Sequence, residues 1–200
     1  EGGAAALVAV PADPEALSSA LDRWLVVCPT VTLESPMEGA AGVVAPDNAA
    51  LGRQLAAALL EDWTGGEVLL LDTAGRCAGV AERLAAAEAA LTEAEVPVRR
   101  AETLPEGDGT AWVMAFEPSA TQRSAEKKEA EGRSFALYGV GTTAAITAQL
   151  ERGSVAAMAA WSDYAAGYLA VRRAAEAARG EEGELAALPF LILRGEDIYA

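Results

Sequence analysis

Short apolar segments alternate with helical segments along the whole chain, and this alternation leaves few folds open to it. The expected strands are Ala4–Val10, Thr30–Leu33, Gly42–Ala45, Glu67–Asp72, Val96–Arg100, Ala111–Phe116, Phe135–Val140, Val155–Ala160 and Pro189–Leu193. The expected helices are Asp13–Trp24, Ala49–Trp63, Val80–Glu93, Ser119–Glu131, Ala144–Arg152 and Tyr164–Arg179. Strands separated by helices form βαβ units, whose right-handed crossovers build a parallel sheet with helices on both faces. The sequence therefore predicts an α/β fold.

Local signals near the start of the chain support this prediction. Asp13, Pro14 and Glu15 are typical of a helix start, with Asp at the N-cap and Pro in the first turn. The segment Ala4–Val10 is apolar throughout, as in a buried parallel strand. Trp24 lies at the end of the expected helix, and we expect it in the core.

Charge and composition exclude several classes of function. The formal net charge of −15 argues against nucleic acid as a partner, because that partner needs a basic surface. The chain has no His, which removes the Ser-His-Asp triad and most zinc sites. Cys28 and Cys77 are its only thiols, and they either pair in a disulfide or stay free. We therefore expect no metal, no cofactor and no enzymatic reaction.

The carboxyl ends of the expected strands indicate where a ligand would bind. In open parallel sheets, ligands lie beyond these ends. The ends here are Glu34-Ser35, Asp72–Arg76, Phe116-Glu117, Gly141-Thr142 and Trp161–Asp163. This location follows from the strand order and needs no further knowledge of the protein.

The acidic and basic residues at these ends each have an alternative interpretation. Glu34 and Glu117 are candidates for an acid–base pair, for hydrogen-bond acceptors toward a ligand, or for solvated side chains. Arg76 and Arg83 each have a guanidinium that can bind a carboxylate or hydroxyl groups, and for either of them a surface ion pair with Glu82 or Glu88 is an equal alternative. Arg76 is the better ligand candidate because it lies in a loop.

The remaining motifs are also open to two interpretations. Trp161 can stack on a ring-shaped ligand or pack at a hinge between lobes. The segment Gly139–Thr143 can bind an anion through its N–H groups or form a tight strand-to-helix turn. The segment Ser119–Glu131 is expected to be a solvated helix without a functional signal.

The order of the segments resembles that of type I periplasmic solute-binding proteins. Leu7–Leu17 (LVAVPADPEAL) is similar to a strand-and-helix step of the sugar-binding members, and Val44–Leu60 (VAPDNAALGRQLAAALL) to one of their helices. Ile146–Gly180 follows the family pattern of helix, strand, polar loop and long helix. Ribose-binding-protein-like receptors and lac-repressor-like sensor domains share this pattern.

The resemblance implies two doubly wound parallel-sheet lobes with a hinged cleft. We expect residues 1–64 to form part of the first lobe, 65–160 the second lobe, and 161–200 a crossover whose helix and strand return toward the first lobe. Hinge segments would lie near Ala45, Val140–Thr143 and Trp161. The ligand contacts expected at the strand ends are Glu34, Ser35, Arg76, Glu117, Gly141, Thr142, Trp161 and Asp163.

The sequence differs from the family pattern in two ways that affect which partners and ligand we expect. The family begins with two strand–helix units that are missing here, so we expect an incomplete first lobe, covered by another chain or by a swapped copy of this one. The family's sugar-binding side chains are replaced by Glu34-Ser35, Glu117-Pro118, Gly141 and Trp161. The resemblance implies an exported protein, either periplasmic or extracellular and anchored to the membrane. This protein would deliver a small polar, sugar-like solute to the permease of an ABC importer. A ligand-less regulatory or interaction module on the same fold is the alternative.

Overall fold

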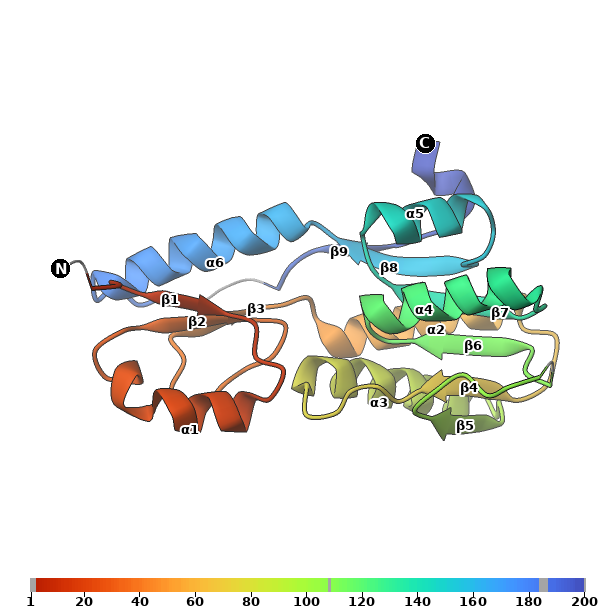
Figure 1. Ribbon diagram of the computed structural model, residues 1–200, viewed down its shortest axis with the longest axis horizontal. Helices are drawn as coiled ribbons and strands as arrows, with labels where there is room; N and C mark the ends of the chain where they lie inside the picture. The colour runs from red at the N-terminus through yellow and green to blue at the C-terminus, as the bar shows by residue number, and fades with distance from the viewer. Residues whose placement is uncertain (1–2, 108, 184–186, 200) are drawn as a thin grey trace. The chain divides into compact units, whose positions relative to one another are not determined.

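Parallel sheets flanked by helices make up the structure, a computed structural model that describes residues 3–107, 109–183 and 187–199 (Figure 1). Its residues form two compact units. Unit 1 comprises Glu1–Asp47, Gly75–Gly79 and Ser162–Pro189, and unit 2 comprises Asn48–Ala74, Val80–Trp161 and Phe190–Ala200. The expected α/β fold is confirmed.

Unit 1 is built on a three-stranded parallel sheet with the order β1-β2-β3. The strands are β1 (Leu7–Ala9), β2 (Thr30–Leu33) and β3 (Gly42–Val44). Helix α6 (Asp163–Ala178) lies on one face of this sheet and α1 (Pro14–Leu25) on the other (Figure 1). The sheet is therefore covered on both faces, although each layer is thin.

Helix α1 begins as the sequence predicts. The Asp13 side chain accepts a hydrogen bond from the Ala16 N–H at 3.0 Å, and Pro occupies the first turn. The prediction that Trp24 lies in the core is wrong, because Trp24 is 64% exposed and no residue of α1 is buried. Strand β1 is only half-buried, contrary to expectation, because it lies at the edge of its sheet with β2 as its neighbour.

Unit 2 is built on a six-stranded sheet with the order β5-β4-β6-β7-β8-β9. Its strands are β4 (Val68–Leu71), β5 (Val98–Ala101), β6 (Trp112–Ala115), β7 (Ala136–Val140), β8 (Ala157–Trp161) and β9 (Phe190–Leu193). The first five are parallel, whereas β9 runs antiparallel to β8, which the expectation of parallel sheets did not foresee.

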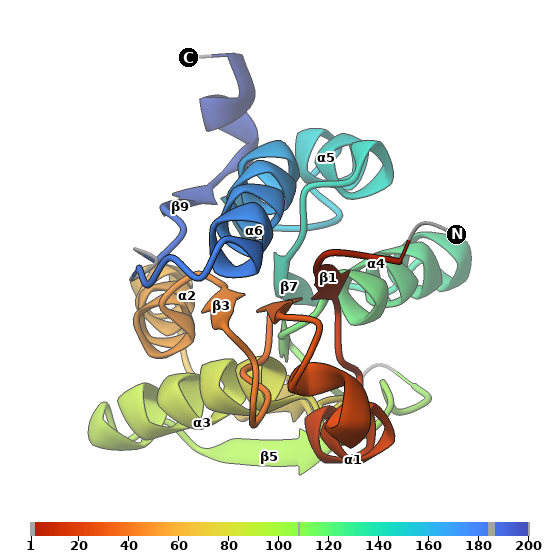
Figure 2. The same ribbon diagram turned by 90° about the vertical axis from the view of Figure 1, so that its left-hand side faces the viewer.

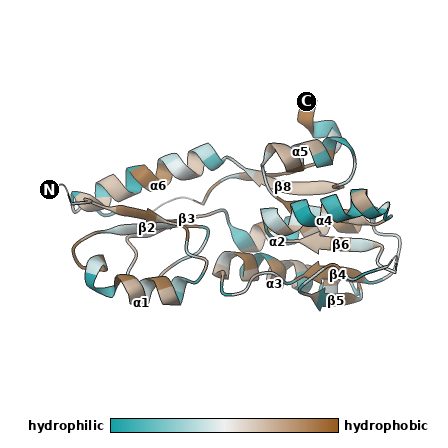
Figure 3. Cartoon of the chain, in the orientation of Figure 1, coloured by the Kyte–Doolittle hydropathy of each residue, from teal (hydrophilic) through white to brown (hydrophobic). Residues whose placement is uncertain are grey.

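The helices of unit 2 cover both faces of this sheet. They are α2 (Asn48–Asp62), α3 (Ala78–Glu93), α4 (Pro118–Glu131), α5 (Ala144–Glu151) and the short 3₁₀ helix η1 (Gly195–Tyr199). Helices α2 and α3 lie on one face and α4 and α5 on the other (Figure 2). Figure 3 shows the pattern that drives this layering, with hydrophobic residues in β4 and a mostly hydrophilic α4. Every residue of β4 is buried.

The units depart from the expected ranges 1–64, 65–160 and 161–200 at two secondary-structure elements, and also in that Gly75–Gly79 belongs to unit 1 and Trp161 to unit 2. Helix α2 belongs to unit 2, because it packs against β7, β8 and β9. Strand β9 also belongs to unit 2, because its backbone pairs with β8 in the register Met158 to Leu193. Within the part of the chain that the structure describes, no helix has both the length and the apolarity needed to cross a bilayer.

Candidate functional site

Three neighbouring strands of unit 2 end in residues that the sequence predicts as ligand contacts. Strands β6, β7 and β8 are adjacent and parallel, so their carboxyl ends share one edge of the sheet. Glu117 lies just beyond β6, Gly141-Thr142 follow β7, and Trp161 ends β8. Unit 2 therefore brings these four predicted residues to one sheet edge.

The backbone at this edge is tightly fixed. Gly141 has a φ of +149°, and a Cβ there would lie 2.4 Å from Cδ1 of Ile146. The buried Thr121 hydroxyl accepts a hydrogen bond from the Val140 N–H at 3.0 Å and donates to the Glu117 carbonyl at 3.0 Å, so it links the ends of β6 and β7. Thr143 caps α5 by accepting from the Ile146 N–H, as in a tight strand-to-helix turn.

A buried arginine lies beneath the indole of Trp161. Arg83 is 1% exposed, and its guanidinium carbon is 4.8 Å from the centre of the Trp161 ring. Its Nε donates to Asn48 Oδ1 at 2.6 Å, and its Nη1 donates to the Phe116 carbonyl at 3.2 Å. A cation against the ring face attracts its π electrons, and burial strengthens this attraction. Arg83 thus holds the ring of Trp161 and the start of α2 in fixed positions.

The surface ion pair offered as an alternative for Arg83 is wrong. The side chain is buried, and Glu88 is paired instead with Arg100, which lowers the pKa of the Glu88 carboxyl through a hydrogen bond. Gly52 explains part of this burial, because a Cβ there would lie 2.1 Å from the Arg83 carbonyl oxygen. Helices α2 and α3 therefore meet through their backbones and enclose the side chain.

Glu117 lies among polar groups at the start of α4. Its Oε1 accepts a hydrogen bond from the Ser119 hydroxyl at 2.7 Å and lies 3.6 Å from Arg123 Nη2. A carboxylate is favourable at a helix N-terminus because of the exposed N–H groups there. Its side chain remains 26% exposed, so it can still accept a hydrogen bond from a ligand.

In unit 1, the residues after β2 adopt a strained turn. Glu34 has a φ of +70°, and the Ser35 N–H donates to the Leu33 carbonyl at 2.8 Å, which closes a γ-turn around Glu34. A residue other than Gly in this region costs free energy and is a reason to suspect function. Ser35 is fully buried, its hydroxyl accepts from the Gly79 N–H at 3.2 Å, and its Oγ lies 3.1 Å from Cys77 Sγ. Cys28 and Cys77 are both free thiols.

The two other predicted residues of unit 1 lie near helix starts. The Arg76 side chain is 68% exposed and pairs with Asp13 at 3.2 Å and Glu15 at 3.7 Å, at the start of α1. Asp163 is the first residue of α6, next to the N-cap Ser162, whose hydroxyl accepts from the Ala165 N–H. Acidic and N-capping residues in these positions stabilise the helix termini.

The predicted site residues thus fall into two groups of four, one in each unit. Glu34 belongs to unit 1 and Glu117 to unit 2, so neither unit assembles this pair for acid–base chemistry by itself. Within the described ranges, no group of three His, Cys, Asp or Glu side chains is placed to hold a metal ion.

Sequence reasoning missed the contacts that organise these groups. Asn48 accepts from Arg83, which lies 35 residues away, and Ser35 contacts Cys77 at a separation of 42 residues. Neither spacing repeats a known motif. A sequence signal did exist for Arg83, since it lies on the same expected helix as the apolar residues that face the sheet.

Comparisons with known proteins were made on both sequence and structure. Residues 1–182 match the family model of a periplasmic binding protein domain. The periplasmic component of an ABC-type sugar transport system from Hahella chejuensis is similar with a TM-score of 0.87 and 20% identity, over 97% of this chain and 79% of that one. A search among curated proteins gave no match.

Two further solved structures contain sugars. An ABC transporter solute-binding protein from Agrobacterium vitis with bound D-fucose has a TM-score of 0.84 and 15% identity, over 96% of this chain and 76% of that one. A carbohydrate transporter solute-binding protein from Agrobacterium radiobacter, in complex with D-arabinose, has a TM-score of 0.83 and 15% identity, over 97% of this chain and 75% of that one. These likenesses confirm the expected fold.

Proposed function

The chain belongs to the periplasmic binding protein domain family, and on this premise we propose that it binds a small sugar-like solute at its strand ends without reacting with it. The fold by itself does not determine function, so the proposal rests on the site. Its main support is the sheet edge of unit 2, where Glu117 and Trp161 lie at the ends of neighbouring strands.

This edge supplies what a sugar requires. Sugar rings present hydroxyl groups that need acceptors and donors, and apolar faces that stack on aromatic rings. Glu117 offers a partly exposed carboxylate, and Trp161 offers an indole that Arg83 holds in place. In unit 1, taken by itself, the strained turn at Glu34 is a further candidate ligand contact at the end of β2.

We extend the proposal to transport. The similar structures are a periplasmic component of a sugar transport system from Hahella chejuensis and transporter solute-binding proteins from two Agrobacterium species, each of the latter two with a bound sugar. The proposed role is that of an exported receptor, either periplasmic or extracellular and anchored to the membrane, that passes its ligand to the permease of an ABC importer.

A partner chain at unit 1 is also proposed. Strand β1 is the edge of its sheet, and Tyr164, Tyr168 and Val171 form an exposed row on one face of α6. Another chain or a second copy that covers these groups would give a dimer or complex. Sedimentation velocity tests this, and a single monomeric species at all protein concentrations, alone or with the candidate partner, contradicts it.

Isothermal titration calorimetry against D-fucose, D-arabinose and other monosaccharides tests the proposed function. We expect saturable binding of at least one sugar. Trp161→Ala should weaken that binding by about tenfold or more, because the stacking surface is lost. Trp24→Ala is the control, since it removes another indole that is 64% exposed on α1 and lies outside the strand ends, and it should change the affinity less than about twofold.

Two outcomes of the calorimetry would contradict sugar binding. If no sugar binds, or if Trp161→Ala and Trp24→Ala have the same small effect, the sugar-binding proposal fails. If no sugar binds but a protein partner does, the chain is instead the regulatory or interaction module.

A further inference from the structure

A second pocket in unit 2 lies against α4, next to Glu117 but lined by other residues than those assigned to the sugar. Its volume is about 220 Å³, and all of its lining residues belong to unit 2. It shares no lining residue with the set Glu117, Gly141, Thr142 and Trp161. This volume is below the roughly 300 Å³ at which drug-sized pockets begin, so the pocket suits a small molecule.

The floor of this pocket is apolar and rigid. Leu71, Leu104 and Ala120 line it, and all three belong to the hydrophobic core of unit 2. Core side chains are close-packed and hold their positions. The floor therefore favours an organic molecule with carbon atoms over a bare inorganic ion.

One hydroxyl group in the pocket has no partner. Thr73 lines the pocket just beyond β4, and its Oγ1 is buried without a hydrogen bond to any described residue. Such a group is costly to leave unpaired. Thr103 and the buried Ser124 add two more hydroxyl groups to the lining. Thr73 Oγ1 exposes less than 1 Å² to solvent, so it would bond to a ligand oxygen after a rotation of its side chain toward the pocket.

The charges of the pocket are unusual for so acidic a chain. Arg123 and Lys127 lie one turn apart on α4 and both line the pocket, against the single acid Glu102. Lys127 Nζ lies 3.5 Å from the Leu104 carbonyl and 3.9 Å from Glu131 Oε1, and Arg123 Nη2 lies 3.6 Å from Glu117 Oε1. These three distances exceed those of good hydrogen bonds, so a ligand carboxylate that comes closer can compete with the two glutamates.

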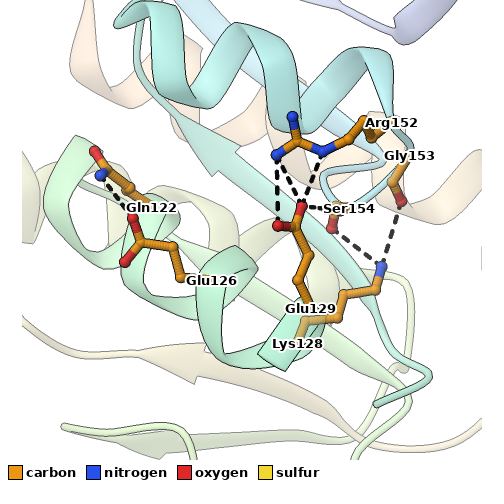
Figure 4. Close-up of polar contacts among 7 residues, drawn as sticks. All are labelled: Gln122, Glu126, Lys128, Glu129, Arg152, Gly153 and Ser154. Atoms are coloured by element: carbon orange, nitrogen blue, oxygen red, sulfur yellow. Dashed lines mark hydrogen bonds and ion pairs between the residues drawn. The ribbon is translucent and has the colours of Figure 1, made fainter. Parts of the chain in front are cut away.

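Other side chains of α4 hold this wall in place. Lys128 Nζ donates to the carbonyls of Ser154 at 3.0 Å and Gly153 at 3.4 Å, in the turn after α5 (Figure 4). Glu129 accepts from the Ser154 hydroxyl at 2.5 Å and from Arg152 at 3.0 Å. Because these contacts fix α4, Arg123 and Lys127 are presented from a positioned helix and not from a loose surface segment.

We propose that this pocket binds a small hydroxylated carboxylate, of the sugar-acid class. The ligand carboxylate pairs with Arg123 and Lys127, and its hydroxyl groups bond to Thr73 and Ser124 over the apolar floor. The helix expected to carry no functional signal thus supplies the anion-binding wall. The inference goes beyond the proposed function, since the two sites take different molecules.

Calorimetry with D-gluconate and D-galacturonate as probes, and with D-glucose and D-galactose as neutral counterparts, tests the proposal. The carboxylates should bind saturably at this site. Lys127→Gln and Arg123→Gln should each weaken carboxylate binding by about tenfold or more, because a charged hydrogen bond is lost. Thr73→Val should weaken it by about fivefold, as expected for a neutral hydrogen bond.

The matched control is Arg53→Gln, which removes the same charge from an exposed position on α2 and should change the affinity less than about twofold. Backbone amide shifts in NMR spectra should move at Thr73, Leu104 and Ser124 when D-gluconate is added. The proposal is overturned if neither carboxylate binds saturably. It is also overturned if Trp161→Ala abolishes carboxylate binding while Lys127→Gln and Arg123→Gln leave it intact.

Discussion

The two units use the same βαβ pattern but bury it to very different extents. In unit 2, every residue of β4 lies inside a six-stranded sheet that is covered on both faces. In unit 1, β1 is half-buried and α1 has no buried residue. Among the residues that the structure describes, seven of the eight large exposed hydrophobic ones belong to unit 1, namely Val10, Trp24, Val26, Val27, Tyr164, Tyr168 and Val171. Sheet size, more than local sequence, therefore sets the burial.

This difference has consequences for both stability and recognition. The apolar side chains of a central strand in a covered sheet are almost completely removed from water, and each buried side chain then stabilises the fold. An edge strand leaves part of that surface exposed. Unit 2 therefore has the stronger core, whereas unit 1 keeps apolar groups that remain open to contacts with other molecules.

Truncation of one apolar side chain in each sheet should give the largest contrast. Leu70→Ala, in the fully buried β4, should lower the free energy of unfolding by about 3 kcal/mol through lost burial and the cavity it leaves. Val8→Ala, in the half-buried β1, should cost less than about 1 kcal/mol. Urea unfolding followed by circular dichroism measures both values. If Leu70→Ala and Val8→Ala lower the free energy of unfolding equally, the two units do not differ in core strength as described.

A partly exposed polar network around the buried Tyr138 of unit 2 should give a smaller, pH-dependent effect. The Tyr138 hydroxyl donates to Asp62 Oδ2 at 2.5 Å, and Arg194 Nη1 donates to the same oxygen at 2.7 Å. These bonds, that of Tyr138 first and that of Arg194 second, lower the pKa of the Asp62 carboxyl below its usual 3.8. Burial raises the pKa of Tyr138, so its hydroxyl stays protonated and donates.

Tyr138→Phe should therefore cost about 1 kcal/mol at pH 7. Because the pKa of Asp62 is depressed in the folded state, its contribution is present above pH 3.8 and is lost as the pH falls through the folded value. The cost of Tyr138→Phe should shrink accordingly in urea unfolding below about pH 4. Tyr164→Phe, at a hydroxyl that is exposed in unit 1, is the control and should show no pH-dependent difference. A cost that stays constant down to pH 2 would contradict this account.

The smallest effect comes from two glutamates with positive φ, one in each unit. Glu34 has a φ of +70° in unit 1, and Glu95 has a φ of +58° after α3 in unit 2. Replacement by Gly should raise the free energy of unfolding by about 0.5–1 kcal/mol at either position, because Gly adopts this conformation without strain. Only Glu34→Gly should also weaken sugar binding, as measured by calorimetry. If the Glu34→Gly protein binds sugar normally, the Glu34 side chain is not a ligand contact and its strained backbone has no role in binding.

Much of the local structure was predictable from the sequence. Thr30–Leu33 is the strand that was expected, and α1 begins with the predicted Asp13 cap and Pro14. Such features depend on residues within a few positions of one another, because β-branching, N-capping and proline geometry act locally. Strand ends are equally local features, so the sequence predicts Glu117, Gly141 and Trp161 at the carboxyl ends of strands, and the strand order of unit 2 makes those strands neighbours.

Contacts between distant segments were decided only by the tertiary structure. The direction of β9, the exposure of Trp24 and the burial of Arg83 beside Asn48 each depend on which elements pack together. The pocket beneath α4 also needs three elements at once, since Thr73, Leu104 and Lys127 lie far apart in the chain. The sequence by itself determined an acidic α/β chain with polar groups at its strand ends. Packing determined which of those groups are buried, paired or open to a ligand, because burial depends on neighbours that local sequence does not specify.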